Sequence, residues 1–215
     1  MLFGRKPPPS RSELVVAADR ARAKGHLRRA IAGYRKALEL EPKDPAVLGK
    51  LAPLLARTNE AEASLKSFQE AAQVHLDKGF ADKALAVYTQ AAETFPTQVG
   101  LWQQVSQMHL ERGRQADAVR VLLRGRFSLR HRKERAAAIL LLRDVLRLEP
   151  TLFAPRLDLA RLLARQRQPA EARALLEPML HLTGAQLRQV RWTLLCIAPG
   201  PGAGWRWLRA ALLGR

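Results

Sequence analysis

The sequence predicts an all-α fold built from repeated helical units. Three segments share one spacing of small, large and small residues that ends in proline, with steps of four, three and five residues. They are Ala30-Tyr34-Ala37-Pro42, Ala84-Tyr88-Ala91-Pro96 and Ala138-Leu142-Val145-Pro150. The prolines recur at a fixed interval, since 96 − 42 = 54 and 150 − 96 = 54. No strand-like alternation interrupts the helical periodicity. Repeat proteins usually work through an extended surface and seldom through a catalytic pocket.

Each copy of the pattern predicts two helices joined by a tight turn. Positions four and then three residues apart lie on one side of a helix, so Tyr34 stands between two alanines on the same face. Small residues there let a second helix approach closely. Gly25 and Gly79 precede the first two copies by five residues, where a left-handed glycine would close a preceding helix. The prolines cannot continue a helix interior, so each unit is expected to read helix, turn, helix, stop.

These units resemble the tetratricopeptide repeat, a helix-turn-helix unit of about 34 residues. The units begin at residues 11, 45, 99 and 153, and the fourth departs from the pattern at Arg156, which replaces an apolar or aromatic residue. The matching residues are Leu14, Ala17, Ala18, Ala21, Gly25, Ala30, Tyr34, Ala37 and Pro42; Leu48, Leu51, Ala52, Leu55, Ser64, Phe68 and Ala71; Trp102, Val105, Ser106, His109, Gly113, Ala118, Leu122 and Gly125; and Leu159, Ala160, Leu163, Ala172, Leu176 and Met179.

Two further copies overlap these four, at residues 65–96 and 119–150. Phe68 and Ala71 therefore serve the end of one unit and the start of the next. We expect single long helices near residues 60–78 and 115–131 to do both jobs, so that three helices occupy each period of 54 residues. The fold class is thus a helical-repeat solenoid of tetratricopeptide-like units with some long shared helices, over residues 11–182.

The two ends of the chain depart from the repeat. Residues 1–10 include three consecutive prolines and are expected to be a disordered tail, whose apolar part is far too short for a signal peptide. Residues 183–215 are expected to form capping helices, with a Pro/Gly-rich break at 198–204. Trp192, Trp205 and Leu208 would cover the last repeat. The alternative is that this tryptophan- and arginine-rich end docks a partner or a membrane surface.

Composition limits the classes of protein that the chain can belong to. It has 215 residues, 47% of them hydrophobic and 26% charged, which is enough to bury a continuous core. No apolar run reaches the roughly 20 residues that span a bilayer. The solitary Cys196 excludes an internal disulfide framework, and a reducing, cytoplasmic setting is the simplest expectation.

Catalytic, metal and cofactor sites are not expected. The histidines are scattered, and none pairs with another histidine or a cysteine at metal-ligand spacing. Cys196 has no charged neighbour in Trp-Thr-Leu-Leu-Cys-Ile, so a buried apolar role is favoured over that of a nucleophile. The glycines at 200, 202 and 204 follow a helix rather than a strand, which favours a linker over a phosphate loop.

Positive charge is the second informative property. The chain carries 37 basic against 19 acidic residues, a net charge of +18. Residues 58–111 have three lysines against seven acids, whereas residues 112–135 have nine basic residues against two acids. A basic cluster of this kind is either a solvated face or a site for carboxylates, phosphates or anionic lipid. Nucleic acid is the less expected partner, because no stacking aromatics or zinc-finger spacing accompany the arginines.

These observations predict a non-enzymatic adaptor or scaffold that binds another protein or peptide of acidic character. If the family resemblance holds, the partner would lie in a groove lined by the first helix of each unit, glutamine-rich at its centre and flanked by cations. The family's carboxylate-clamp type is not expected, since Val15 and Asp19 stand where it needs lysine and asparagine. The alternative is a peripheral membrane- or nucleic-acid-associated protein that binds through its charge. The candidate partner-binding residues are Arg22, Lys66, Gln69, Gln73, Gln103, Gln107, Arg120, Arg124, Arg130 and Arg161.

Overall fold

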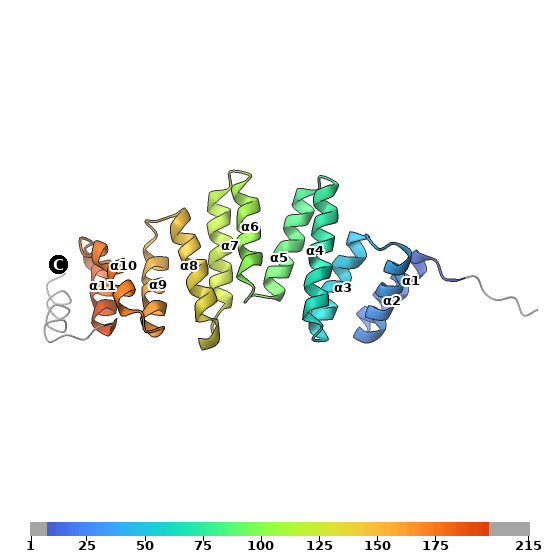
Figure 1. Cartoon of the computed structure of the whole chain (residues 1–215), viewed down its shortest axis with the longest axis horizontal. Coiled ribbons are helices and arrows are strands. Elements are labelled where there is room, and N and C mark those ends of the chain that lie inside the picture. Colours follow the sequence, from blue (N-terminus) through green and yellow to red (C-terminus); the bar gives the residue numbers. More distant parts are fainter. Residues whose placement is uncertain (1–7, 198–215) are drawn as a thin grey trace, which may run out of the picture. The chain divides into compact units, whose positions relative to one another are not determined.

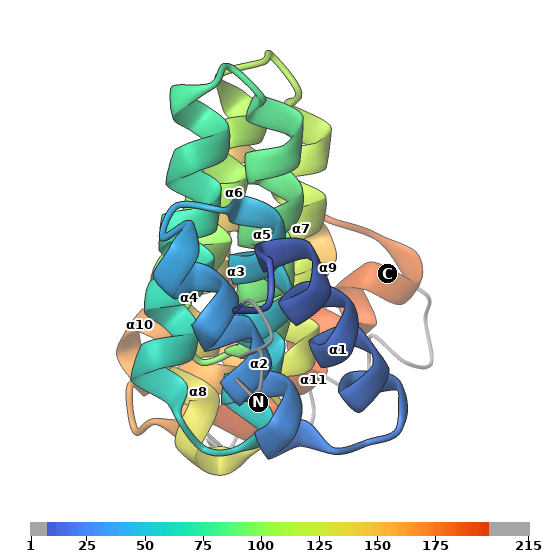
Figure 2. The ribbon, with the colours of Figure 1, turned by 90° about the vertical axis from the view of Figure 1, so that its right-hand side faces the viewer.

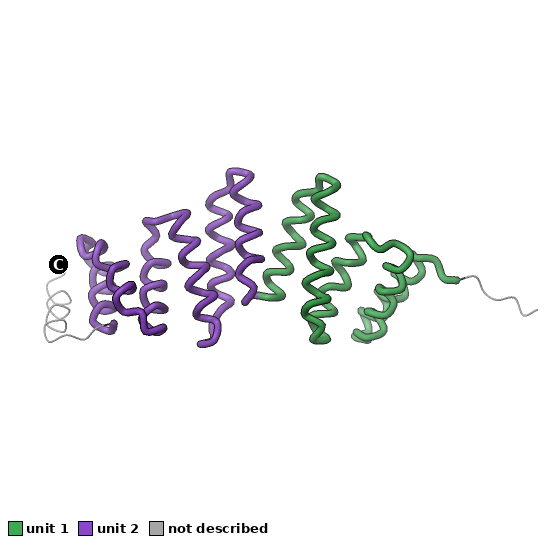
Figure 3. Tube along the Cα trace, viewed as in Figure 1, with its two compact units in different colours: residues 1–95 green, residues 96–215 purple. Residues whose placement is uncertain are grey.

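A computed structural model describes residues 8–197, and all regular structure within that range is helical (Figure 1). The chain divides into two compact units, Met1–Phe95 and Pro96–Arg215 (Figure 3). The first unit contains α1 (Arg11–Ala23), α2 (Leu27–Leu40), α3 (Pro45–Arg57), α4 (Ala61–Asp77) and α5 (Ala81–Thr94). The second contains α6 (Val99–Leu110), α7 (Gln115–Ser128), the 3₁₀ turn η1 (Arg132–Glu134), α8 (Arg135–Leu148), α9 (Phe153–Arg165), α10 (Pro169–Leu176), η2 (Glu177–Met179) and α11 (Gly184–Ile197).

The three repeat prolines end their helices as the sequence predicts. Helices α2, α5 and α8 each stop two residues before the proline, at Leu40, Thr94 and Leu148. The reason is steric, because the residue that precedes a proline is pushed out of the helical region of backbone space.

The tight turns share one backbone geometry. In each, one residue has a positive φ between 63° and 76°, and the next residue donates its N–H to a carbonyl five residues earlier. These left-handed residues are Gly25, Asn59, Gly79, Gly113 and Arg167. The predicted left-handed glycines at 25 and 79 are confirmed. The same turn also accepts asparagine and, between α9 and α10, an arginine, at a cost that glycine would avoid.

Small residues set the helix spacing in the first unit. A Cβ added to Gly33 of α2 would lie 2.9 Å from the Cβ of Ala18 on α1, so these two helices touch almost backbone to backbone. Tyr34 and Phe68, the large members of the motif, are fully buried. Helix α4 packs against both α3 and α5, while α3 also contacts α5 (Figure 2). Helix α4 is therefore shared by two helix pairs, as predicted.

The second unit repeats this packing around Trp102. Its side chain is 1% exposed, and its indole N–H donates to the carbonyl of Pro96 at 3.1 Å. Gly125 of α7 lies under the indole, where any Cβ would come within 2.7 Å of the ring. The third copy of the repeat motif is buried as well, with Ala138, Leu142 and Val145 at most 1% exposed.

One predicted helix is shorter than expected. The sequence predicts a helix over residues 115–131, but α7 ends at Ser128. Leu129 adopts an extended backbone and is itself buried, 3% exposed. Its carbonyl accepts a hydrogen bond from Nη1 of Arg126 at 3.2 Å, which replaces the helical bond that the chain gives up. Residues 129–134 therefore form a separate connection to α8.

The C-terminal helix occurs where it is predicted, but Trp192 does not bury itself as a cap. Helix α11 contacts α9 and α10 through a face that carries the buried residues Leu187, Val190 and Thr193. Trp192 is 48% exposed on another face of the helix. Trp205, Leu208 and the predicted break at 198–204 lie outside the described residues, as do the first seven residues of the predicted tail.

Candidate functional site

Metal-binding geometry does not occur in the described part of the chain. No three His, Cys, Asp or Glu side chains between residues 8 and 197 gather closely enough to hold a metal ion. Burial, reinforced by Lys83 and Lys78, lowers the pKa of His75 below its ordinary value. Burial likewise lowers the pKa of His109. Both imidazoles pack at the edge of the repeat core, a structural role.

The expectation for Cys196 is wrong. The sequence around it is apolar, yet Cys196 is exposed, because α11 turns Val190 and Thr193 inward instead.

None of the helices formed by residues 8–197 is both long and apolar enough to cross a lipid bilayer.

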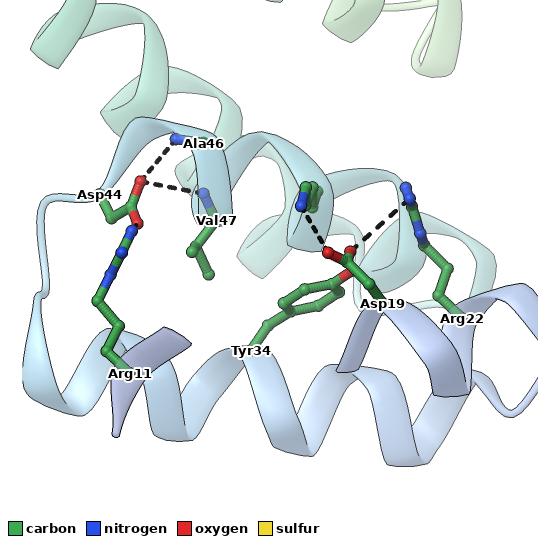
Figure 4. A network of polar contacts seen from close by, with 8 residues as sticks. Arg11, Asp19, Arg22, Tyr34, Asp44, Ala46 and Val47 are labelled. Carbon is green, nitrogen blue, oxygen red and sulfur yellow. Dashed lines mark hydrogen bonds and ion pairs between the residues drawn. The ribbon is translucent and has the colours of Figure 1, made fainter. Parts of the chain in front are cut away.

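A network of partly buried polar side chains connects the first three helices (Figure 4). The hydroxyl of Tyr34 on α2 donates to Asp19 on α1 at 2.6 Å, and Lys50 on α3 donates to the same carboxylate at 2.8 Å. Arg22, a candidate binding residue, lies 3.8 Å from it. Partial burial alone would raise the pKa of Asp19, but the hydrogen bonds from Lys50 and Tyr34 and the nearby positive charges hold it below its ordinary value. Burial of Tyr34 and its hydrogen bond to Asp19 raise the pKa of Tyr34 well above its ordinary value.

A second set of contacts fixes the start of α3. Asp44 accepts hydrogen bonds from the backbone N–H groups of Ala46 at 2.9 Å and Val47 at 3.3 Å, and so caps the helix. Arg11, the first residue of α1, pairs with the same carboxylate (Figure 4). It also pairs with Glu41 at 2.9 Å. Both polar clusters therefore serve the fold of the first unit, and Arg22 is an exposed candidate cation beside the first of them.

The remaining candidates of the first unit lie on α4. Lys66, Gln69 and Gln73 are all exposed, on the side of α4 that faces away from α3 and α5. Lys66 lies 3.9 Å from Glu70, and Gln73 donates to Asp77 at 2.7 Å. These pairs are one helical turn apart and exposed, so they add little to stability.

The two candidate glutamines of the second unit lie on α6, and one of them bonds to a neighbouring helix. Gln103 on α6 donates to Asp144 on α8 at 2.6 Å, which marks the side on which these two helices meet. Gln107, one turn further along α6, donates to Glu111 at 3.2 Å. Both side chains are exposed, so their amide groups lie at the surface of the helices that form this face.

The candidate arginines of the second unit are distributed over three segments. Arg120 and Arg124 lie one turn apart on the exposed side of α7, and Arg120 pairs with Asp117 at 2.8 Å. Arg130 lies in the connection after α7, and Arg161 is exposed on α9. We call Arg120, Arg124 and Arg130 the basic patch.

The connection between α7 and α8 borders a hollow that we call the arginine cleft. Its volume is about 300 Å³, and it lies between the end of α7, the start of α8 and the C-terminal half of α9. The apolar walls come from Leu129, Ala138 and Leu162, and His131 lines it too. The other lining residues are Arg126, Phe127, Arg130, Arg135 and Arg165.

Arg126 has a structural role that the sequence did not reveal. It is only 15% exposed and forms a two-pronged ion pair with Asp158 of α9, at 2.8 Å from Nε and 3.0 Å from Nη2. This guanidinium is therefore neutralised within the unit. Arg130, Arg135 and Arg165 contact only backbone carbonyls or solvent in the described structure, and none of them has a carboxylate within ion-pair distance. Arg165 was not a candidate because it lies 35 residues beyond Arg130, since 165 − 130 = 35.

Helix pairs closed by one common left-handed turn, with small residues between the paired helices, define a helical-repeat protein. The pairs α1–α2, α3–α4, α6–α7 and α9–α10 carry the buried small and large residues of the tetratricopeptide repeat at its spacing. The chain is therefore a helical-repeat protein whose helix pairs resemble the tetratricopeptide repeat.

Comparison with known proteins gives the following matches. No protein-family model and no curated protein sequence matches the chain. Among solved structures, a tetratricopeptide repeat protein from Parabacteroides merdae ATCC 43184 is 18% identical, with a TM-score of 0.31 over 94% of this chain and 90% of that one. MamA is 14% identical, with a TM-score of 0.33 over 95% and 91%. YrrB, a tetratricopeptide protein with an unusual peptide-binding site, is 14% identical, with a TM-score of 0.32 over 92% and 91%.

Proposed function

We propose that the protein is a non-enzymatic adaptor or scaffold that binds an acidic segment of another protein. The observation that supports the proposal is a helical-repeat fold whose second unit places exposed arginines on one helix and on the connection that follows it. Repeat folds present a broad surface of exposed helix faces, and guanidinium groups suit carboxylate or phosphate groups.

Two surfaces contribute to binding under this proposal. The basic patch supplies charge, and the exposed amides of Gln103 and Gln107 supply donors and acceptors for a peptide backbone. In the first unit, Arg22, Lys66, Gln69 and Gln73 extend the polar surface, and in the second Arg161 does so. We also propose a cytoplasmic setting, because Cys196 has no second cysteine in the chain with which to pair.

The net charge of +18 favours a second candidate function. A protein with this charge can bind anionic lipid or nucleic acid without any specific site. Such binding follows the total charge, so it depends on the number of cations and steeply on salt, and hardly on where the cations lie.

The experiment that tests the adaptor proposal compares two charge-reversal variants of equal size. In the first, Arg120, Arg124 and Arg130 are changed to glutamate. In the second, three exposed residues of the first unit, Arg28, Arg29 and Lys36, are changed to glutamate. We expect a partner captured by the wild-type chain to be lost from the basic-patch variant and retained by the control.

Equal loss from both variants would refute the adaptor proposal and support binding by total charge. Retention of the partner by both variants would show that the basic patch takes no part in binding. Sedimentation with anionic and with neutral vesicles separates the lipid version of the second function, and a gel shift at two salt concentrations separates the nucleic-acid version.

A further inference from the structure

We infer that the arginine cleft binds a phosphorylated side chain of a peptide, an inference that rests on the proposed adaptor function. The cleft lies at the junction of α7, α8 and α9, and it shares Arg130 with the basic patch. It would give the adaptor a specific anchor point for one residue of its partner.

The preceding copy of the repeat has no arginine at the positions that correspond to the four arginines of the cleft. The residues that stand 54 positions earlier, in the preceding copy, are structural equivalents of those that line the cleft. Arg126, Arg130, Arg135 and Arg165 correspond to Ala72, Leu76, Ala81 and Glu111, since 126 − 54 = 72, 130 − 54 = 76, 135 − 54 = 81 and 165 − 54 = 111. Not one of these equivalents is a cation, whereas the core residue Ala138 corresponds to another alanine, Ala84.

The backbone departs from the repeat at the same place. In the preceding copy, α4 continues to Asp77 and turns tightly at Gly79 into α5. In this copy α7 ends at Ser128, three residues before its counterpart would, since 77 + 54 = 131. The extra connection is held open by two contacts, one from Arg126 to the carbonyl of Leu129 and one from the N–H of His131 to Glu134 at 2.8 Å. The additional arginines and the cleft therefore occur at the same place in the same copy of the repeat.

The charge balance of the cleft favours a doubly charged ligand. Asp158 neutralises Arg126, and Glu134 accepts the N–H of His131 but keeps its charge. The four arginines of the cleft against these two carboxylates leave an excess of two positive charges, since 4 − 2 = 2. Arg135 donates one N–H to the carbonyl of Arg165 at 3.4 Å, and Arg130 one to the carbonyl of Phe127 at 3.5 Å, which leaves most of their donors unused. A carboxylate brings one charge and two oxygens, whereas a phosphomonoester brings nearly two charges and three oxygens.

The size and the apolar parts of the site favour a side chain of a peptide over a free ion. A volume of about 300 Å³ exceeds what one phosphate needs, and the apolar walls suit the carbon atoms to which it is attached. Phe127 stands at the site and is 64% exposed, an unusually open position for a phenylalanine. An apolar neighbour of the phosphorylated residue would pack on this ring.

The test measures binding of short fluorescent peptides to the full chain by anisotropy. The peptides have the sequence Gly-Leu-X-Leu-Gly, with X being phosphoserine, aspartate or serine. We expect the phosphoserine peptide to bind at least about tenfold more tightly than the aspartate peptide, and the serine peptide to bind negligibly. Arg135→Gln and Arg165→Gln should each weaken the phosphoserine peptide by about tenfold, since each removes one charged partner.

Two variants serve as controls. Arg173→Gln removes one exposed charge from α10 in the same unit and should leave the affinity unchanged. Phe127→Ala should weaken the peptide while leaving competition by inorganic phosphate unchanged, which separates the apolar contact from the anion contact. Thermal melts of each variant verify that the fold is intact, and the exposed positions of Arg165 and Phe127 make loss of the fold the less expected result.

Several outcomes would overturn the inference. These are equal binding of the aspartate and phosphoserine peptides, unchanged binding after Arg135→Gln and Arg165→Gln, peptide binding no tighter than that of inorganic phosphate, and binding only to phosphatidylcholine vesicles that contain phosphatidylinositol 4-phosphate. The adaptor proposal fails separately. A partner lost from an Arg120→Glu/Arg124→Glu variant, which leaves Arg130 intact, and retained by the Arg135→Gln/Arg165→Gln variant would refute the cleft alone. A partner retained by the Arg120→Glu/Arg124→Glu variant and lost from the Arg135→Gln/Arg165→Gln variant would refute the basic patch alone.

Discussion

Replacing Gly125 by alanine should destabilise the second unit, although alanine is the better helix former. The added Cβ would lie 2.7, 2.8 and 2.9 Å from Cδ2, Cγ and Cε2 of Trp102, and carbon atoms prefer separations of about 3.5–4.0 Å. The indole cannot retreat freely, because it is 1% exposed and its N–H is bonded to the carbonyl of Pro96. Overpacking of this kind costs about 1–3 kcal/mol, and the helix propensity of alanine returns up to about 1 kcal/mol. Because all three contacts are shorter than 3.0 Å, the cost lies in the upper part of this range, about 2–3 kcal/mol, and the expected net loss is about 1–2 kcal/mol.

The assay is urea and thermal unfolding followed by far-ultraviolet circular dichroism. For a chain of this size, 1 kcal/mol shifts Tm by about 2–4 °C, so the loss is measurable. Gly100→Ala is the control, since Gly100 lies on the same helix as Trp102 and a Cβ there meets nothing within 4 Å. In a Trp102→Phe background the cost of Gly125→Ala should shrink, because the smaller ring leaves room. A Gly125→Ala chain as stable as the wild type, or a cost that is unchanged in the Trp102→Phe background, would refute the reasoning.

Three further predictions concern stability. Arg126→Gln should lower the free energy of unfolding by about 2 kcal/mol, because it leaves Asp158 without its two charged hydrogen bonds; thermal melts measure this. Asp19→Asn should lower stability at pH 7, but the difference from wild type should shrink on acidification below about pH 4. The reason is that the pKa of Asp19 is lower in the folded chain than in the unfolded chain. The stability that Asp19 contributes is therefore present above its unfolded-state pKa and is lost as the pH falls through its folded-state pKa. Arg167→Gly should raise stability by about 0.5 kcal/mol in urea unfolding, because φ at this position is 63°.

Each of these predictions has a matched control. Arg120→Gln should change stability by less than about 0.5 kcal/mol, because its side chain is 76% exposed; an equal cost at both arginines would contradict the role given to the Arg126 pair. Glu62→Gln removes an exposed carboxylate of the same unit, and a loss of stability at pH 7 as large as that of Asp19→Asn would argue against the role given to the Asp19 network. Asn59→Gly should have almost no effect, since asparagine tolerates the left-handed conformation, and a gain as large as that at Arg167 would contradict this account.

The helices were predictable because the signals that define them are local. Spacing of small and large residues marks a buried face within a single helix, and prolines and glycines act on their immediate neighbours. The same signals predicted that α4 would be shared between two helix pairs. They located the left-handed turns only in part. Three of these turns have a glycine, whereas Asn59 and Arg167 carry no sequence signal as strong as that of a glycine.

The end of α7 was not predictable because a distant residue decides it. Every residue from 128 to 131 can extend a helix, and the sequence offers no breaker there. Leu129 leaves the helix to bury its side chain, and Arg126 satisfies the carbonyl that is thereby freed while holding Asp158 on α9. A contact across 32 residues, since 158 − 126 = 32, has no periodic signature.

The candidate site was predictable only where its residues lie close together in the sequence. Local charge density drew attention to Arg120, Arg124 and Arg130, but the helix that completes the arginine cleft contributes Arg165 from outside that segment. Comparison of the copies 54 residues apart could have found it, because cations stand there against alanine, leucine and glutamate. Trp192 and Cys196 were misjudged because α11 ends the repeat and buries only one of its faces.

The sharing of α4 between two helix pairs constrains how the length of this chain can change. Deletion of residues 43–96 would join Pro42 to Thr97, so that a proline-terminated helix again precedes the opening helix of a unit. Deletion of residues 45–78, one repeat of the usual length, would instead place the end of α2 before α5, two closing helices in succession. Duplications and losses within this gene would therefore preserve the fold in steps of 54 residues rather than 34, so that lengths among related chains would be spaced by three helices.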